Sequence, residues 1–245
     1  MQAAEDCSSV VTDVHPSVQR LLDAPKIAQR TPEWFEYRRH RVTASEVSTV
    51  LAQGKGATSL IVAKKASAML RGVSNEYTRI GSENEPEVVR LYNLLYPHVK
   101  VYHDLPVVPH KKHSFVAASL DACTNTGINV EIKTIFKDSH VKVCKAHRDQ
   151  VQLQMEVADL DVTHLVHHYY RMTGTPIVVH TIARDRGWFK KSLPIIESFV
   201  KKLNDYFPFD MGVVATQMGE PFPFDMEVVS SQVRALVRVD NNKMI

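Results

Sequence analysis

The chain has 245 residues, of which 44% are hydrophobic, so it can bury a sizeable core in one large domain or two small ones. Its 30 basic and 27 acidic residues leave a formal net charge of only +3, which permits nucleic acid as a partner without requiring it. Three cysteines that share no metal-binding spacing, with no stretch resembling a signal peptide or a membrane span, predict a soluble intracellular protein without a membrane partner.

The first part of the chain predicts a loosely attached arm. Residues 1–29 are mostly polar and carry one short apolar run around Leu21, enough for a single helix. The ordered core is expected to begin near Arg30. From there Thr31 followed by Pro32 is typical of a capped helix start, since proline fits the first helical position.

A second helix is predicted where Thr43 and Glu46 stand three apart, the spacing of a capping box. Ser45 would then lie in the first turn, where backbone N–H groups can bind an anion. Arg38 could add a guanidinium fork for a phosphate group. The alternative interpretation is a plain capped helix with a surface arginine.

Further helices are predicted from Leu60 to about Leu70 and from Ser82 through Leu95, where apolar residues recur at helical spacing. Ser82 and Glu85 form another capping box, which gives Glu85 an adequate structural role. Residues 99–108 then alternate well enough for one strand.

Residues 115–134 predict a β-hairpin, because Thr124-Asn-Thr-Gly127 supplies turn chemistry between β-rich segments. Alternation along the second strand puts Glu131 and Lys133 on one face, and a turn centred on residues 125–126 places Asp121 opposite Glu131. Two carboxylates and an ammonium would then converge, and carboxylate oxygens suit Mg²⁺. The alternative is an ordinary solvated hairpin face.

A basic loop over residues 137–148 suits a polyanion, although solvated loops often have this composition. A helix is expected to start at Gln150, with Gln154 on the same face. A second hairpin over residues 163–183 would turn His164 and His167 to opposite sides, which argues against zinc.

The last clear helix is predicted from Ser192 to Phe207, covering the sheet with its apolar side. Beyond it, the motif Phe-Pro-Phe-Asp-Met occurs at 207–211 and again at 222–226. Two copies cannot form a solenoid, so the motif reads as a docking segment or a duplicated edge strand.

Four motifs, in this order between residues 30 and 205, resemble those of the lambda exonuclease and YqaJ-like viral recombinase family of the PD-(D/E)xK nuclease superfamily. They are Trp34-x3-Arg38-x4-Thr43-Ala-Ser45-Glu46, Gly81-x3-Glu85, Asp121-x9-Glu131-x-Lys133 and Gln150-Val-Gln152. One departure is Leu120, which stands where the superfamily usually has proline. Proline is no metal ligand there, so the exchange leaves the chemistry intact.

This resemblance implies an α/β fold with a restriction-endonuclease-like core, in which a small mixed central β-sheet is flanked by α-helices. The nuclease domain would span residues 30–207, with an N-terminal arm at 1–29 and a C-terminal tail of unknown role at 208–245. The implied activity is Mg²⁺-dependent 5′-to-3′ removal of nucleotides from double-stranded DNA, in recombination, repair or viral genome processing.

The resemblance also implies a role for each motif residue. The metal ligands would be Asp121, Glu131 and Glu85, with Glu83 and Glu87 as the neighbouring alternatives to Glu85, and Mn²⁺ would substitute for Mg²⁺. Catalysis would use Asp121 and Glu131 together with Lys133 and Gln150, which position the water. The 5′-phosphate of the DNA end would be bound by Arg38, Ser45 and Ser119.

The implied partners are double-stranded DNA ends, a single-strand annealing protein and further copies of the chain in a homotrimer. Two alternatives stay open. One is another nuclease of the superfamily, such as an endonuclease or a CRISPR-type exonuclease, although the cysteine cluster of the iron–sulfur branch is missing. The other is a DNA-end-binding module without catalysis, against which the intact Asp, Glu and Lys argue.

Overall fold

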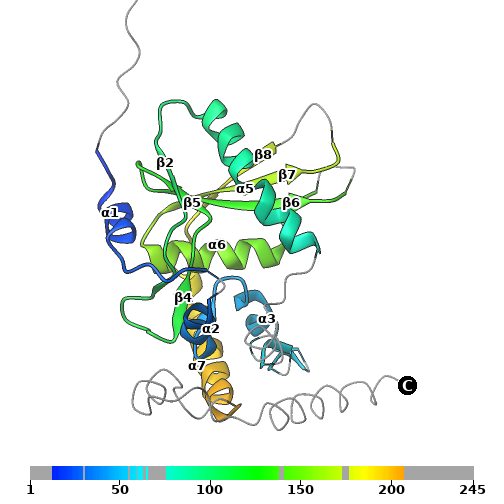
Figure 1. Cartoon of the computed structure of the whole chain (residues 1–245). Coiled ribbons are helices and arrows are strands. Elements are labelled where there is room, and N and C mark those ends of the chain that lie inside the picture. Colours follow the sequence, from blue (N-terminus) through cyan, green and yellow to red (C-terminus); the bar gives the residue numbers. More distant parts are fainter. Residues whose placement is uncertain are drawn as a thin grey trace, which may run out of the picture.

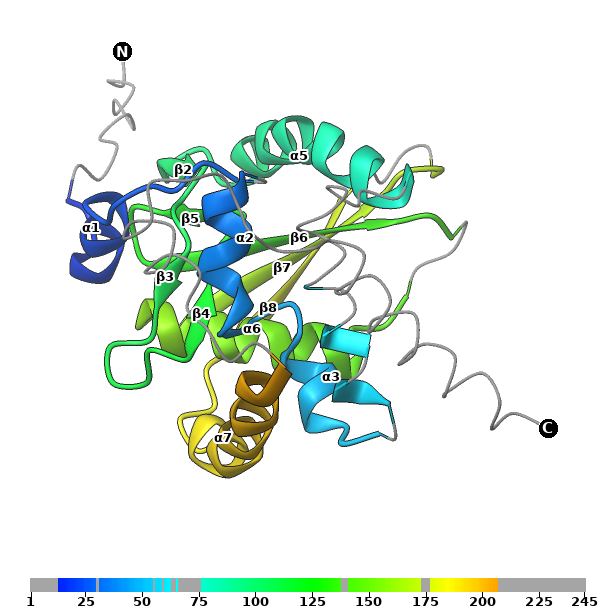
Figure 2. The ribbon, with the colours of Figure 1, turned by 60° about the horizontal axis from the view of Figure 1, so that its bottom comes forward.

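A five-stranded mixed sheet forms the centre of the protein, with helices on both faces (Figure 1). The computed structural model describes residues 13–29, 31–54, 56–58, 60–62, 65, 76–137, 141–172 and 177–206. The strands lie in the order β2 (Val101–His103), β5 (Ala122–Thr124), β6 (Ile128–Ile135), β7 (Val162–Tyr169) and β8 (Ile177–Ala183). Figure 2 shows helix α5 (Glu76–Leu95) over one face and α6 (Lys145–Ala158) under the other. This arrangement confirms the predicted α/β fold.

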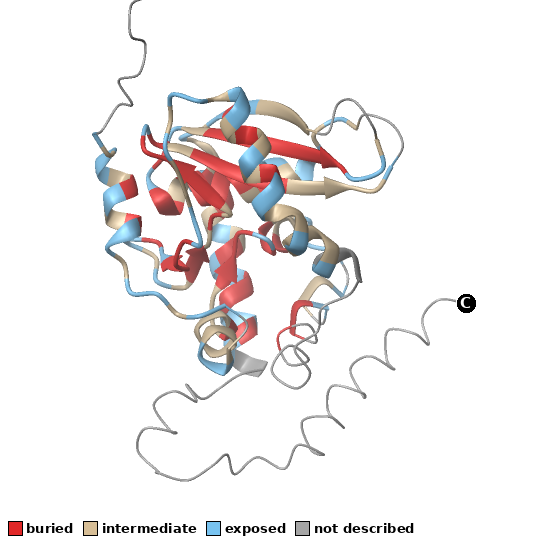
Figure 3. Cartoon of the chain, turned by 45° about the horizontal axis from the view of Figure 1, so that its top comes forward, coloured by how far each residue is buried: buried red, intermediate tan, exposed pale blue. Residues whose placement is uncertain are grey.

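The two faces of the sheet bury separate sets of apolar side chains. Val130 of β6 packs with Val88 of α5 on one face, whereas Leu165 of β7 packs with Met155 of α6 on the other. Successive side chains of a strand point to opposite faces, so both faces can be apolar only where helices cover them. The burial pattern follows this rule, because most of the buried ribbon belongs to the strands and to α6 (Figure 3).

Helix α6 connects two parallel strands of the sheet. Strand β6 pairs with β7 in parallel, with Glu131 opposite Leu165 and Lys133 opposite His167. The neighbouring pairs, β5 with β6 and β7 with β8, are antiparallel, as the two predicted hairpins require. The chain therefore crosses from β6 to β7 through a helix that lies beneath both strands.

A second, three-stranded sheet has the order β1 (Val42–Thr43), β4 (Val116–Ala118) and β3 (Val108–Pro109). Residues 99–108 were expected to form one strand, and this expectation is wrong, because β2 and β3 belong to different sheets. Asp104 has a φ of 57° between them, a left-handed conformation that turns the chain out of an extended path. The second sheet brings β1 and β4 side by side, and both lead into the candidate site.

The described part of the N-terminal arm packs on the core. In α1 (Pro16–Leu22), Val18 and Leu21 are fully buried in the largest apolar cluster. Nη2 of Arg20 donates to the carbonyl oxygens of Val157 and Ala158, at 3.1 and 2.7 Å, and so satisfies two free acceptors at the end of α6. The expectation that the ordered core starts only near Arg30 is therefore wrong.

Three other helix starts also differ from the prediction. Helix α2 (Pro32–Arg39) begins as expected, with Oγ1 of Thr31 accepting from the backbone N–H of Trp34. Helix α3 (Val47–Leu51) begins after Glu46 and not at Thr43, which belongs to β1. Helix α6 begins at Lys145, before Gln150. Helix α7 (Trp188–Tyr206) also starts early, and it packs mainly against α3 and α6 instead of covering the sheet.

Two predicted features fall largely outside the described residues. They are the repeated Phe-Pro-Phe-Asp-Met segments and most of the helix expected from Leu60 to about Leu70. Within the described part of the chain, no helix is long and apolar enough to cross a membrane.

Candidate active site

The hairpin of β5 and β6 places Asp121 across from Glu131. Ala122 pairs with Val130, so the next residue outward on each strand is one of the two acids. The turn is closed by a hydrogen bond from the N–H of Gly127 to the carbonyl of Thr124, and Gly127 has a φ of +89° that favours glycine. The predicted register is confirmed.

Asp121 also marks the point where β5 stops covering the edge of β6. Its Oδ2 accepts a hydrogen bond of 2.8 Å from the backbone N–H of Ile132. A side-chain carboxylate thus replaces the missing strand partner. The cavity described below opens at this uncovered edge.

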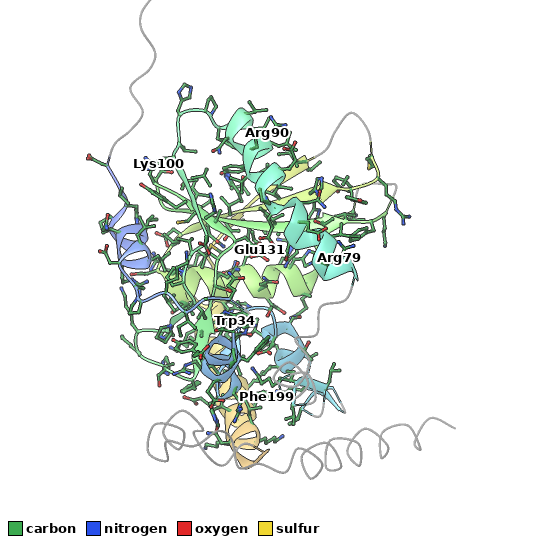
Figure 4. The ribbon with its side chains drawn as sticks, viewed as in Figure 1. Trp34, Arg79, Arg90, Lys100, Glu131 and Phe199 are labelled. Carbon is green, nitrogen blue, oxygen red and sulfur yellow. The ribbon has the colours of Figure 1, made fainter. Side chains whose placement is uncertain are left out.

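Glu131 is the most enclosed acid of the site, with 1% of its surface exposed. Figure 4 shows it between the sheet and α6, near the middle of the molecule. Its Oε1 accepts from Nζ of Lys133 at 2.6 Å and from Nε2 of Gln150 at 2.5 Å. Its Oε2 accepts from Nε2 of Gln154, also at 2.5 Å. A buried carboxylate needs such donors, because water is excluded from it.

The charges of the three residues are strongly coupled. Burial, followed by the neighbouring carboxylate of Glu131, raises the pKa of Asp121 well above its usual value. Burial alone would lower the pKa of Lys133, but Glu131 and Asp121 outweigh it and raise that pKa. The lysine therefore keeps its proton, while the two acids repel each other in a space that favours a bound cation.

Among the three glutamates of α5, Glu85 lines the cavity with Asp121 and Glu131. Glu83 forms an ion pair with Arg79, and Glu87 forms one with Arg90, both on the exposed side of the helix. The helix start predicted at Ser82 is wrong, because α5 already begins at Glu76. The capping box therefore does not explain Glu85.

The donor set at this point suits Mg²⁺ or Mn²⁺, since hard cations prefer carboxylate oxygen. Asp121, Glu131 and Glu85 would supply those oxygens. Across the described residues, no three acidic, imidazole or thiol groups already lie at metal-ligand spacing. Glu131 instead spends its oxygens on Lys133 and the two glutamines, so it would have to exchange one of these contacts for the ion.

A second group of predicted residues lies at the other end of the same cavity. Nη2 of Arg38 lies 3.1 Å from Oγ1 of Thr43 and 3.4 Å from Oγ of Ser45. Its guanidinium stacks over the ring of Trp34, with Cζ 4.2 Å from the ring centroid. Ser45 does not lie in a helix, because α3 starts two residues later, so the predicted helix N-terminal anion site is wrong. The arginine and the serine are nevertheless neighbours.

A buried ion pair supports this arginine from below. Lys65 donates to Oε2 of Glu46 at 2.9 Å and to the carbonyl oxygens of Arg38 and Arg41 at 2.7 and 3.0 Å. Oε2 of Glu46 also accepts from both the backbone N–H and the hydroxyl of Thr43. The Thr43 and Glu46 pattern found in the sequence is thus a real local motif, although it braces a turn and not a helix start.

One cavity of about 200 Å³ joins the two groups. All eight residues that the sequence proposed for the site line it, namely Arg38, Ser45, Glu85, Ser119, Asp121, Glu131, Lys133 and Gln150. Sequence reasoning missed Gln154 and Lys65 as supports. The only signal for Gln154 was its place one turn after Gln150 on the same helical face, and Lys65 carried none.

The histidines of the second hairpin lie away from this cavity. His164 faces α5, where its Nδ1 lies 2.7 Å from the hydroxyl of Tyr92. His167 faces the other way and packs against His147 and His180, with ring centroids 5.7 and 4.6 Å apart. The predicted opposite orientation of His164 and His167 is confirmed.

Comparisons with known proteins give a consistent picture. The YqaJ-like viral recombinase domain matches residues 33–164, more than half of the chain. Two crystal structures of LHK-Exo, an alkaline exonuclease from Laribacter hongkongensis, each align with a TM-score of 0.63 at 22% sequence identity. Each alignment covers 76% of this chain and 99% of the other, and one of these structures is a complex with dAMP. A search of curated protein sequences finds no match.

The structural likeness shows a shared fold, and the sequence match spans α2 through β7, which contain all four motifs. The resemblance predicted from those motifs is confirmed. This chain belongs to the YqaJ-like viral recombinase domain family.

Proposed function

We propose that the protein is a Mg²⁺-dependent 5′-to-3′ exonuclease acting on double-stranded DNA ends. The observation that carries this proposal is the single cavity that holds an acid–lysine cluster at one end and the Arg38–Ser45 pair at the other. A cluster of acids and a lysine suits hydrolysis of a phosphodiester, and a guanidinium beside a hydroxyl suits a terminal phosphate. An exonuclease needs both at a fixed separation.

Each residue has a distinct task in this proposal. Lys133 and Gln150 hold the attacking water near the scissile phosphorus, and the lysine offsets the negative charge that develops on the phosphoryl oxygens. Arg38, Ser45 and Ser119 bind the terminal phosphate and so set the distance from the end to the cut. A metal ion held by Asp121, Glu131 and Glu85 would act as a Lewis acid and lower the pKa of bound water.

Attack by water breaks the bond between phosphorus and the 3′-oxygen of the first nucleotide. That nucleotide leaves with its own 5′-phosphate and a 3′-hydroxyl group. The shortened strand keeps the scissile phosphate as its new 5′-end. The product strand thus carries the group that the Arg38–Ser45 pair recognises, and the next cycle can begin.

The test is digestion of linear duplexes with and without a 5′-phosphate, in Mg²⁺ and in EDTA, with a closed circular duplex beside them. We expect release of mononucleotides from the linear duplexes in Mg²⁺ only, faster from phosphorylated ends, and an intact circle. Cutting of the circle would favour the endonuclease alternative. Duplex binding without any cleavage would favour an inactive end-binding module.

The variant Lys133→Ala serves as the matched control for this assay. It should abolish digestion while gel shifts and thermal melts stay near those of the wild type, because the side chain acts at the phosphate and not in the core. Mn²⁺ should restore activity after chelation, whereas Ca²⁺, with its larger and more variable oxygen shell, should not. Assembly as a homotrimer remains a prediction, and light scattering that finds a monomer would exclude it.

A further inference from the structure

A second cavity, of about 510 Å³, adjoins the candidate active site. It shares Ser45, Lys133 and Gln150 with the first cavity, so the two open into each other. Its volume falls within the range of pockets that bury small molecules, roughly 300–1,000 Å³. The smaller cavity holds the charged groups, and the larger one offers the space.

Two helices that lie side by side form the walls of this second cavity (Figure 2). One wall consists of Ser48, Thr49 and Ala52, which share a face of α3 with Ser45 at helical spacing. The other wall consists of Ala146 and His147 in the first turn of α6. These five side chains include no carboxylate, and burial lowers the pKa of His147, which is therefore neutral near pH 7.

The two cavities thus divide by charge. The carboxylates of Glu85, Asp121 and Glu131 line only the smaller cavity, as does Arg38. The larger cavity is bounded by Ser45 at the terminal-phosphate side and by Lys133 at the hydrolytic side. A ligand that fills it would have to be a largely neutral group carrying a phosphate at each end.

In a DNA strand, one nucleoside links each phosphate to the next. If the terminal phosphate lies at Arg38 and the scissile phosphate at Lys133, the first nucleoside must occupy space that touches both positions. We infer that the second cavity receives the base and sugar of the 5′-terminal nucleotide. This inference rests on the proposed function and adds the place of the nucleotide that is released.

The lining of the cavity also predicts how it treats different bases. Specific base recognition requires donors and acceptors matched to a base edge, usually from arginine, asparagine or glutamine. The five wall residues provide two hydroxyl groups, two methyl groups and one imidazole ring, which fit any base by contact and stacking. The terminal base should therefore bind without strong sequence preference.

The experiment compares phosphorylated duplexes that end in a normal nucleotide or in a tetrahydrofuran abasic nucleotide. Wild type should process the abasic end about five- to tenfold more slowly, since base contacts are lost. Ala52→Phe fills the cavity from α3 and should slow the normal substrate about tenfold or more, with a much smaller effect on the abasic one. Ala146→Phe fills it from α6 and should behave in the same way. Ser198→Phe adds the same bulk at an exposed position of α7, outside both cavities, and should leave both rates unchanged.

Each result has one meaning. If wild type digests both ends equally fast, or if both cavity-filling variants slow the two substrates by the same factor, the terminal nucleoside lies elsewhere and the inference fails alone. If wild type digests no duplex in Mg²⁺, the proposed function fails and the inference fails with it. Thermal melts of the three variants identify any loss that comes from misfolding, and the wild-type comparison then decides.

Discussion

Nε2 of Gln154 and Oε2 of Glu131 lie 2.5 Å apart in the buried space between α6 and β6. The same nitrogen donates to the carbonyl of Ser119 at 3.0 Å, while Oε1 of Gln154 accepts from Asn129. This one amide therefore connects the catalytic strand to the segment that precedes Asp121. It acts on the reaction through Glu131 and never touches the phosphate.

Gln154→Leu removes both hydrogen-bonding functions at nearly constant volume. Each buried group left without a partner costs about 1–3 kcal/mol, so we expect the free energy of unfolding to fall by several kcal/mol, together with a large loss of kcat. Gln152→Leu is the matched control, because its amide bonds Ala183 and Asp185 outside the cavity. Denaturant unfolding beside kinetics should show that Gln152→Leu loses stability but keeps most of kcat. Equal kcat losses in the two variants would contradict a positioning role for Gln154.

The buried Lys65–Glu46 pair should stabilise the fold strongly. Burial alone would raise the pKa of Glu46, but Lys65 and Arg38 lower it, so the acid is charged in the folded protein. Lys65→Met leaves that charge buried with one cation fewer and should cost about 3–5 kcal/mol of unfolding free energy. Adding Glu46→Gln should recover part of this loss. A double variant that is less stable than Lys65→Met by the full cost of Glu46→Gln would show that the two residues are not coupled.

Arg38 should decide the preference for phosphorylated ends. Arg38→Ala removes a charge-assisted contact worth on the order of 1.5–3 kcal/mol, and should erase most of the rate difference between 5′-phosphate and 5′-hydroxyl duplexes. Ser45→Ala should reduce the difference less, since a hydroxyl supplies one weaker bond. Arg41→Ala is the control, because Arg41 bonds the carbonyls of Tyr37 and Ser114 and lines neither cavity. A wild-type preference that persists unchanged in Arg38→Ala would place the end pocket elsewhere.

His167 should make the protein sensitive to acid. Burial, with His180, His147 and Lys133 nearby, lowers the pKa of His167 to about 4, while the unfolded chain has the ordinary value near 6.5. The unfolded state therefore binds the proton first, and stability is complete above pH 6.5 and falls as the pH drops toward 4. The loss should reach about 2–3 kcal/mol. His167→Leu should flatten this part of the curve of unfolding free energy against pH. An unchanged slope between pH 6.5 and 4 would assign the acid sensitivity to other groups.

The hairpin could be predicted from the sequence because its determinants are local. Glycine at position 127 meets a positive φ, and the period-2 pattern of β6 fixes which side chains face Asp121. The site residues on it followed directly. Their roles did not, since Asp-x9-Glu-x-Lys alone fits a solvated face, and only the order of several motifs separated the two interpretations.

The remaining errors come from contacts that are distant in the sequence. Glu46 looked like a helix cap, but Lys65 lies nineteen residues later and draws it into a buried pair. The docking of α1 depends on the end of α6, more than 130 residues away, where Arg20 meets Val157. The start of α5 was misplaced because a capping signal at Ser82 also occurs within a longer helix. None of these partners is visible in a local pattern.

The parallel pairing of β6 with β7 affects how the protein is made. Parallel strands cannot be joined by a tight turn, so the ribosome must complete α6 before β7 can be added. The hairpin with Asp121, Glu131 and Lys133 is therefore synthesised first, without the glutamines that hold Glu131. A nascent chain that ends before β7 has its acids in place but no rigid strand beside them. Hydrolytic competence should arise late in translation, when the chain has passed Tyr169.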